Sequence, residues 1–187
     1  MSQHRFVIES IPEKCMGCRK CEVACIAAHH DLSFKEALKK RNELASRVRV
    51  VSTSGVKAPI SCRQCERAPC AIICPTGAMR QVNGLVVVHL EYCAGCRLCI
   101  LACPFGAITL ESLGLPEHKP EATAQTAHHA VAVRCDLCED WREKEGKTVP
   151  ACVEICPVKA RALVDLTALR ETQRKNRLAG SGNLQRL

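Results

Sequence analysis

Cysteine is the residue type through which this chain can do chemistry, and its sixteen copies fall into four groups of four. Every group ends with the step C-x3-C, and the third group has the compact spacing C-x2-C-x2-C-x3-C followed by proline. Such a run wraps three thiolates around one cubane iron-sulfur cluster and directs the fourth towards a second cluster. At four thiolates per cubane, the sixteen cysteines predict four [4Fe-4S] clusters and therefore a protein that conducts electrons. In chain order the groups are Cys15, Cys18, Cys21 and Cys25; Cys62, Cys65, Cys70 and Cys74; Cys93, Cys96, Cys99 and Cys103; and Cys135, Cys138, Cys152 and Cys156.

Two other uses of cysteine explain these groups less well. Cysteine makes up about 9% of the 187 residues, which approaches the content of small disulfide-stapled proteins. Disulfide frameworks scatter their cysteines along the chain, whereas these gather in four loops that repeat the same closing step. Structural zinc sites pair two C-x2-C turns and would leave the repeated C-x3-C step unexplained. Zinc is therefore the alternative, and iron-sulfur clusters are the prediction.

The segments between the cysteines predict the elements that position them. Alternating apolar residues favour strands, and Asn83-Gly84 between two apolar runs is typical of a tight hairpin turn. The order of strand, cluster loop, helix and strand occurs twice and predicts an α+β fold. The expected strands are residues 5–11, 47–52, 107–111 and 160–164, with a hairpin over residues 82–90; the expected helices are residues 19–29 and 34–45.

Aromatic side chains are scarce, with three Phe, one Tyr and one Trp. Because aromatic residues dominate most protein cores, inorganic clusters are expected to fill part of the interior. Folding should then depend on cluster insertion, since ligands confined to loops cannot form a site before the metal arrives.

The opening CMGCRKCEVACIAAH and the lengthened second and fourth groups resemble the four-cluster ferredoxin subunits of the dimethyl sulfoxide reductase, formate dehydrogenase and hydrogenase complexes. The resemblance covers roughly residues 1–165, and similar small members serve formate hydrogenlyase, hydrogen-dependent carbon dioxide reductase and carbon monoxide dehydrogenase systems. It implies two interleaved bacterial-ferredoxin-like halves built on [4Fe-4S] clusters. The implied divisions are residues 1–60 with 130–165 as one half, residues 61–111 as the other, residues 112–129 as a linker or surface excursion, and residues 166–187 as a basic C-terminal helix and tail.

The same resemblance implies which cysteines share a cluster, because each group sends its last cysteine to a partner group. Ile26 stands where the other three groups have proline, which changes the exit of the first loop and leaves the ligand count intact. The implied sets are Cys15, Cys18, Cys21 and Cys156 for cluster one; Cys135, Cys138, Cys152 and Cys25 for cluster two; Cys62, Cys65, Cys70 and Cys103 for cluster three; and Cys93, Cys96, Cys99 and Cys74 for cluster four.

The charge and hydropathy of the chain exclude several function classes. The formal net charge is +8, but the basic residues are dispersed and no nucleic-acid-binding motif accompanies them, so we expect no nucleic-acid partner. No apolar run approaches the roughly 18 residues of a membrane span, and the N-terminal sequence lacks the pattern of a signal peptide. The expected protein therefore has no transmembrane segment, and its default location is the cytoplasm. A subunit carried to the periplasm by the signal of a partner would have the same sequence features.

Several other residues have two interpretations each. Cations in or beside the cluster loops either tune cluster potentials or form a solvated docking face. Histidines are expected to have surface or helix-capping roles, because the cysteines already saturate four cubanes. Trp141 either contacts a partner or packs over the adjacent cluster, and the basic C-terminal helix either docks on another subunit or frays. The cations are Arg19, Lys20, Arg63, Arg67, Arg97 and Arg134, and the histidines are His29, His30, His128 and His129.

No nucleophile triad, paired-carboxylate site, phosphate loop or nucleotide fingerprint is present in the sequence, so substrate catalysis is expected to belong to another protein. The predicted function is that of a non-catalytic electron-transfer subunit. Its expected partners are a catalytic carbon monoxide or formate dehydrogenase on one side and a hydrogenase or other acceptor on the other. The alternatives are a structural or assembly subunit that self-associates through its C-terminal helix, and a freely diffusing polyferredoxin.

Overall fold

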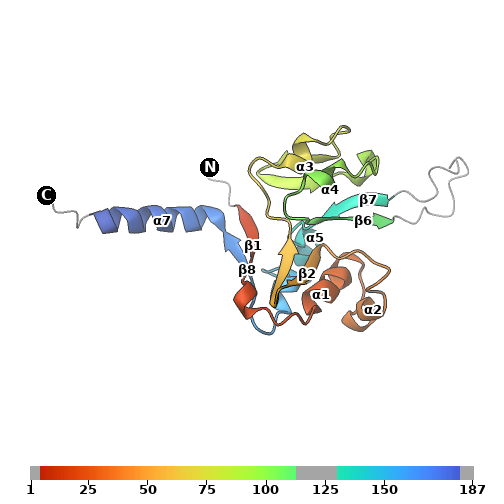
Figure 1. Cartoon of the computed structure of the whole chain (residues 1–187), viewed down its shortest axis with the longest axis horizontal. Helices are drawn as coiled ribbons and strands as arrows, with labels where there is room; N and C mark the ends of the chain where they lie inside the picture. The colour runs from red at the N-terminus through yellow and green to blue at the C-terminus, as the bar shows by residue number, and fades with distance from the viewer. Residues whose placement is uncertain (1–4, 113–129, 182–187) are drawn as a thin grey trace, which may run out of the picture.

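The computed structural model describes residues 5–112 and 130–181, with side chains described as far as Arg177. The fold is α+β, and short strands alternate with short helices around the cysteine loops (Figure 1). The strands are β1 (Phe6–Ser10), β2 (Val48–Thr53), β3 (Val56–Ser61), β4 (Met79–Val82), β5 (Leu85–Val88), β6 (Ile108–Ser112), β7 (Ala130–Arg134) and β8 (Arg161–Asp165). The helices are α1 (Lys20–His29), α2 (Phe34–Lys39), α3 (Pro69–Ile72), α4 (Leu98–Ala102), α5 (Glu139–Glu145), α6 (Ala151–Glu154) and α7 (Leu166–Ser181), with 3-10 turns η1 (Pro12–Lys14) and η2 (Leu90–Tyr92).

The described strands form four separate two-stranded antiparallel sheets, and two of these join distant parts of the sequence. β1 pairs with β8, from Phe6 opposite Asp165 to Ser10 opposite Arg161, so the strand before the first cysteine group lies beside the strand after the fourth. β6 pairs with β7 and connects the exit of the third group to the entrance of the fourth. Figure 1 shows β1 beside β8, with α7 continuing from β8 away from the rest of the molecule.

The other two sheets are local hairpins, β2–β3 and β4–β5. The second hairpin turns at Asn83 and Gly84, whose φ angles of 51° and 79° are those that a tight two-residue turn requires. It begins at Met79, earlier than the predicted residue 82. The Met79 side chain is only 2% exposed, and this burial extends the strand towards the second cysteine group.

Helix α2 is shorter than the predicted helix over residues 34–45 and ends at Lys39. Its start is stabilised by a capping box, in which the Ser33 hydroxyl accepts from the Glu36 N–H and the Glu36 carboxylate accepts from the Ser33 N–H. Ala37 is fully buried against Val23 and Ile26 of α1. The next four residues, KRNE, have no apolar side chain to bury, so packing does not support a second turn.

The core consists of aliphatic residues and cysteines. The two largest buried clusters each contain cysteine side chains beside Val, Ile, Met or Ala residues. Since thiols form much of the interior, whatever they bind becomes part of the core. Among the described helices, none combines the length and the apolar character needed to cross a bilayer.

The predicted linker over residues 112–129, together with His128 and His129, lies outside the described residues except for Ser112, which ends β6. The predicted C-terminal helix is α7, and residues 182–187 of the tail also lie outside the described part. The division of the chain into two halves stays a prediction.

Candidate metal centres

All sixteen cysteines lie in the described part of the chain, and every one is a free thiol. Their side chains gather in four sets, two of which line cavities. One cavity is lined by Cys15, Cys18 and Cys21 together with Cys156, which comes from the far end of the sequence. A second cavity is lined by Cys93, Cys96, Cys99 and Cys74.

The other eight cysteines form two sets, identified by the thiols that act on one another in addition to burial. Cys25 and Cys152 raise the pKa of Cys135 and Cys138, and Cys65 and Cys103 raise the pKa of Cys62 and Cys70. In each set, three thiols come from one sequence group and the fourth from another. The sets therefore group the same residues as the predicted ligand sets, while the assignment of a cluster to each set stays a prediction. The two sets are Cys25, Cys135, Cys138 and Cys152; and Cys62, Cys65, Cys70 and Cys103.

The backbone conformation of the loops repeats between the first and third groups. Gly17 and Arg19 have φ angles of 76° and 57°, and the equivalent Gly95 and Arg97 have 64° and 65°. A left-handed residue reverses the chain locally, and glycine adopts this conformation without strain. The two reversals bend each C-x2-C-x2-C run around its cavity, and the helix that follows starts directly after the arginine.

Backbone N–H groups donate hydrogen bonds to several cysteine sulfur atoms, as is typical of a site for an iron-sulfur cluster. Thiolates bound to iron carry negative charge, and N–H donors to sulfur are one of the means by which proteins adjust cluster potentials. The last cysteines of the first, second and fourth groups each accept such a bond, so the residues present fit the cofactor. The N···S distances are 3.3 Å for Arg47 to Cys25, 3.4 Å for Met79 to Cys74, 3.2 Å for Ala160 to Cys156, 3.5 Å for Ala132 to Cys93 and 3.5 Å for Gln64 to Cys62.

Burial opposes ionisation of the thiols. It raises the pKa of Cys21 to about 12 and that of Cys70 to about 11, although nearby N–H groups act in the opposite direction. A thiol must lose its proton to bind metal, so the positive charge of iron has to offset this desolvation.

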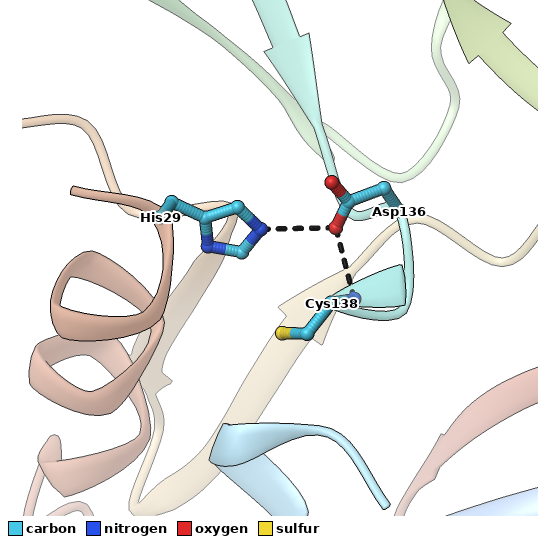
Figure 2. Close-up of side chains that lie close together, drawn as sticks. All are labelled: His29, Asp136 and Cys138. Atoms are coloured by element: carbon cyan, nitrogen blue, oxygen red, sulfur yellow. Dashed lines mark hydrogen bonds and ion pairs between the residues drawn. The ribbon is translucent and has the colours of Figure 1, made fainter. Parts of the chain in front are cut away.

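His29, Asp136 and Cys138 place their ligand-type atoms within 4.8 Å of one another (Figure 2). His29 Nε2 lies 3.0 Å from Asp136 Oδ1, and the Cys138 N–H donates to the same oxygen at 3.0 Å. Arg47 also forms an ion pair with Asp136. Burial would lower the pKa of His29, but hydrogen bonds to Asp136 and Cys25 outweigh it and raise that pKa to about 10. Cys138 belongs to one of the thiol sets, so His29 and Asp136 help to position a residue of that set and do not form a separate metal site.

The surface role predicted for His29 is wrong, since its side chain is 10% exposed. Its Nδ1 atom lies 2.7 Å from the Cys25 carbonyl oxygen and 3.6 Å from the Cys25 sulfur, so the predicted helix-capping role is combined with a contact to a thiol. His30 lies 2.8 Å from the Glu111 carboxylate on β6. Trp141 packs against Ala24, Cys138 and Ala151, which agrees with the interpretation that it covers a cysteine site.

The cations of the cluster loops divide into two classes. Five are exposed, whereas Arg134 is 6% exposed and lies close to Cys62 and Cys135. A second buried arginine, Arg161, is 2% exposed and lines the cavity of Cys15, Cys18, Cys21 and Cys156. The exposed five are Arg19, Lys20, Arg63, Arg67 and Arg97.

Sequence reasoning missed Arg161, Gln64 and Asp136. Gln64 is 1% exposed, and its side chain donates to the Cys135 carbonyl oxygen at 2.9 Å and accepts from the Val86 N–H at 2.8 Å. Asp136 and Gln64 adjoin cysteines in the sequence, which is a weak signal, but their partners lie in other segments.

Comparison with known proteins agrees with this geometry. A family model described as a 4Fe-4S dicluster domain matches residues 54–166, and another described as a 4Fe-4S binding domain matches residues 12–25. An iron-sulfur protein of Rhodospirillum rubrum is 46% identical over 178 residues, covering 94% of this chain and 90% of the relative.

Two proteins of Escherichia coli strain K12 match over a similar extent. The electron transport protein HydN is 36% identical, over 93% of this chain and 95% of its own. Formate hydrogenlyase subunit 2 is 35% identical, over 93% of this chain and 88% of its own. Among solved structures, a chain of the BamBC active-site complex of benzoyl coenzyme A reductase aligns with 94% of this chain and 91% of its own at 19% identity, with a TM-score of 0.39 that is too low to establish a shared fold. The dicluster match and the three relatives show that this chain belongs to the 4Fe-4S dicluster family and is a ferredoxin-type electron-transfer protein.

Proposed function

We propose that the chain is a non-catalytic subunit that relays electrons through four [4Fe-4S] clusters between a catalytic dehydrogenase and a hydrogenase or other acceptor. The observation that carries the proposal is the gathering of sixteen free thiols into four sets of four, each with one member from a different sequence group. A cubane takes four thiolates, so each set has the composition that one cluster needs. When bound, the clusters supply one-electron chemistry, and the chain's residues hold, space and insulate them.

The ligand sets of this proposal are those expected from the sequence. Cys156 completes cluster one and Cys25 completes cluster two, while Cys103 completes cluster three and Cys74 completes cluster four. This exchange of last cysteines would interleave two ferredoxin-like halves, and the pairing of β1 with β8 supports it.

Contacts between the sets support a linear order of clusters. Cys152 of set two helps to raise the pKa of Cys21 of set one, and both side chains belong to one buried cluster. Gln64, which lies between two ligands of set three, binds the carbonyl group of Cys135 in set two. Cysteines of sets three and four share one buried cluster. An electron would therefore pass through clusters one, two, three and four in sequence, or in reverse.

The partner assignment draws on the relatives. One of them is by name a subunit of formate hydrogenlyase, which supports a redox enzyme as the partner of this chain. Helix α7 offers a docking element, because Leu169 is 43% exposed and arginine residues surround it. A cytoplasmic location stays a prediction from the sequence.

Metal analysis of anaerobically purified protein tests the cofactor content. We expect about 16 iron and 16 acid-labile sulfide per chain, from four of each in every cubane. Zinc without sulfide would contradict the proposal. For the relay itself, dithionite-free protein mixed with a reduced partner dehydrogenase should take up about four electrons per chain and pass them to a hydrogenase. A chain that holds four clusters but accepts no electrons from either partner would disprove the relay alone.

A further inference from the structure

Arg161 is a buried cation at the junction of two thiol sets. It is the first residue of β8 and lines the cavity of Cys15, Cys18, Cys21 and Cys156. Strand β8 also packs against α6, which carries Cys152 of the second set. Its charge acts on both sides, because it partly offsets the effect of burial on the pKa of Cys21 and on that of Cys152.

The guanidinium of Arg161 has no carboxylate partner among the described residues. Its Nη2 atom donates to the Ser61 hydroxyl at 2.8 Å, while Nε and Nη1 are buried without an oxygen acceptor. The side chain also lies close enough to the Cys152 thiol to lower its pKa through a hydrogen bond. A buried charge without a counter-charge is strongly unfavourable, because burial removes the water that would otherwise solvate it. The anions that Arg161 can neutralise are the thiolates of the two sets beside it.

Arg134 is a second buried guanidinium, and it lies at the next junction between thiol sets. It is the last residue of β7, and its Nη1 atom donates to the carbonyl oxygen of Cys135, while Nε is buried without an acceptor. Its electrostatic partners are Cys62 of the third set, the Asp136 carboxylate and Cys135 of the second set, while the cation of Arg47 acts in the opposite direction. The Asp136 carboxylate already pairs with Arg47 and His29. Arg134 and Arg161 are the two charged residues classed as buried in the described part of the chain.

We propose that Arg161 is the shared counter-ion of clusters one and two, that Arg134 is the shared counter-ion of clusters two and three, and that each raises the reduction potentials of both clusters beside it. The inference rests on the ligand sets of the proposed function. A cubane with four thiolates becomes more negative by one charge on reduction, so a fixed cation stabilises the reduced form. The interaction is strong because both guanidinium groups are removed from water, whereas exposed cations are screened. Cluster four has no buried cation beside it among the described residues.

The test is a potentiometric titration of the full-length protein, followed by electron paramagnetic resonance, after iron and sulfide contents have been measured. Arg161→Gln should lower the reduction equilibrium constant of two clusters by at least about tenfold, which corresponds to about 59 mV for a one-electron couple. Arg134→Gln should also lower the reduction equilibrium constants of two clusters, and one of these two should be a cluster that Arg161→Gln affects. The reduction equilibrium constant of the fourth cluster should change in neither variant. This overlap identifies the middle cluster without any prior assignment of signals.

Two control variants separate charge from shape. Arg161→Lys retains the cation and should keep all four equilibrium constants within about threefold of the wild type. Arg80→Gln removes an exposed arginine of β4 and should also change them by less than about threefold, because solvent screens that charge.

Several outcomes would overturn the inference: no change in Arg161→Gln, an equal change in all four clusters, or a change in Arg161→Lys as large as that in Arg161→Gln. If a Gln variant loses iron, the loss should be confined to the two clusters beside the replaced arginine, and the Lys variant at the same position should retain those clusters. Iron loss that also occurs in the Lys variant would overturn the inference. Wild-type protein with fewer than four clusters would instead contradict the proposed ligand sets.

Discussion

Replacing Cys25 by alanine tests whether cysteines distant in sequence share a cluster. Cys25 is 4% exposed and closes the first group, yet its thiol lies among Cys135, Cys138 and Cys152. The change removes one of four thiolates from that set. It also leaves the Arg47 N–H without its sulfur acceptor, which costs about 1–3 kcal/mol when the group stays buried.

The expected magnitude follows from the cubane stoichiometry. Complete loss of one cluster lowers the iron content from about 16 to about 12 per chain, and loss of only the corner iron lowers it to about 15. The other three sets keep all four thiols, so three cluster signals should persist in the reduced protein.

The assay compares matched single variants by electron paramagnetic resonance of the reduced protein. Cys25→Ala and Cys152→Ala should abolish or convert the same signal, because their thiols belong to one set. Cys21→Ala and Cys156→Ala should both affect a different signal, because these residues line one cavity. The comparison needs no prior assignment of signals to clusters.

The reasoning is refuted if Cys25→Ala and Cys21→Ala remove the same signal while Cys152→Ala removes another. That result would mean that the first sequence group holds a cluster by itself. It would also disprove the interleaved halves.

Three further predictions concern stability and assembly. Gln64→Leu leaves the Cys135 carbonyl and the Val86 N–H unpaired, which costs about 1–3 kcal/mol each. Anaerobic unfolding of this variant in guanidinium should therefore be at least about tenfold faster than that of the wild type. The control variant Gln173→Leu changes an exposed residue and should unfold at the wild-type rate. Removal of iron by an anaerobic chelator should abolish the far-ultraviolet circular dichroism of the fold, because buried thiols such as Cys21 and Cys70 have raised pKa values and their neutral forms do not hold the loops together. A retained spectrum would contradict this. Deletion of residues 167–187 should leave the iron content unchanged and weaken partner binding. The loss should be larger at low salt, because the range of exposed arginines grows from about 10 Å at roughly 0.1 M ionic strength to about 30 Å at roughly 0.01 M. Full affinity in the truncated chain, measured at equal salt, would show that α7 is no docking element.

The sequence alone determined the chemistry of this protein. Cysteine spacing within a group is a local property, fixed by the reach of a few residues, so it identifies [4Fe-4S] binding before any fold is known. Local signals also located β1, α1 and the turn at Asn83 and Gly84, because strand alternation and turn conformation depend on neighbouring residues. The extent of α2 was predicted wrongly, since its end depends on what the helix can bury against α1.

The tertiary structure decided which residues surround the thiols. The pairing of β1 with β8 joins the two ends of the described cluster-bearing chain, and no local pattern encodes that pairing. Arg161 reads in sequence as an ordinary strand residue, and Arg134 as one cation among several beside the cysteines. Burial distinguishes these two from the exposed arginines of the same loops, because the influence of a charge on a cluster depends on the solvent around it, and only long-range packing removes that solvent.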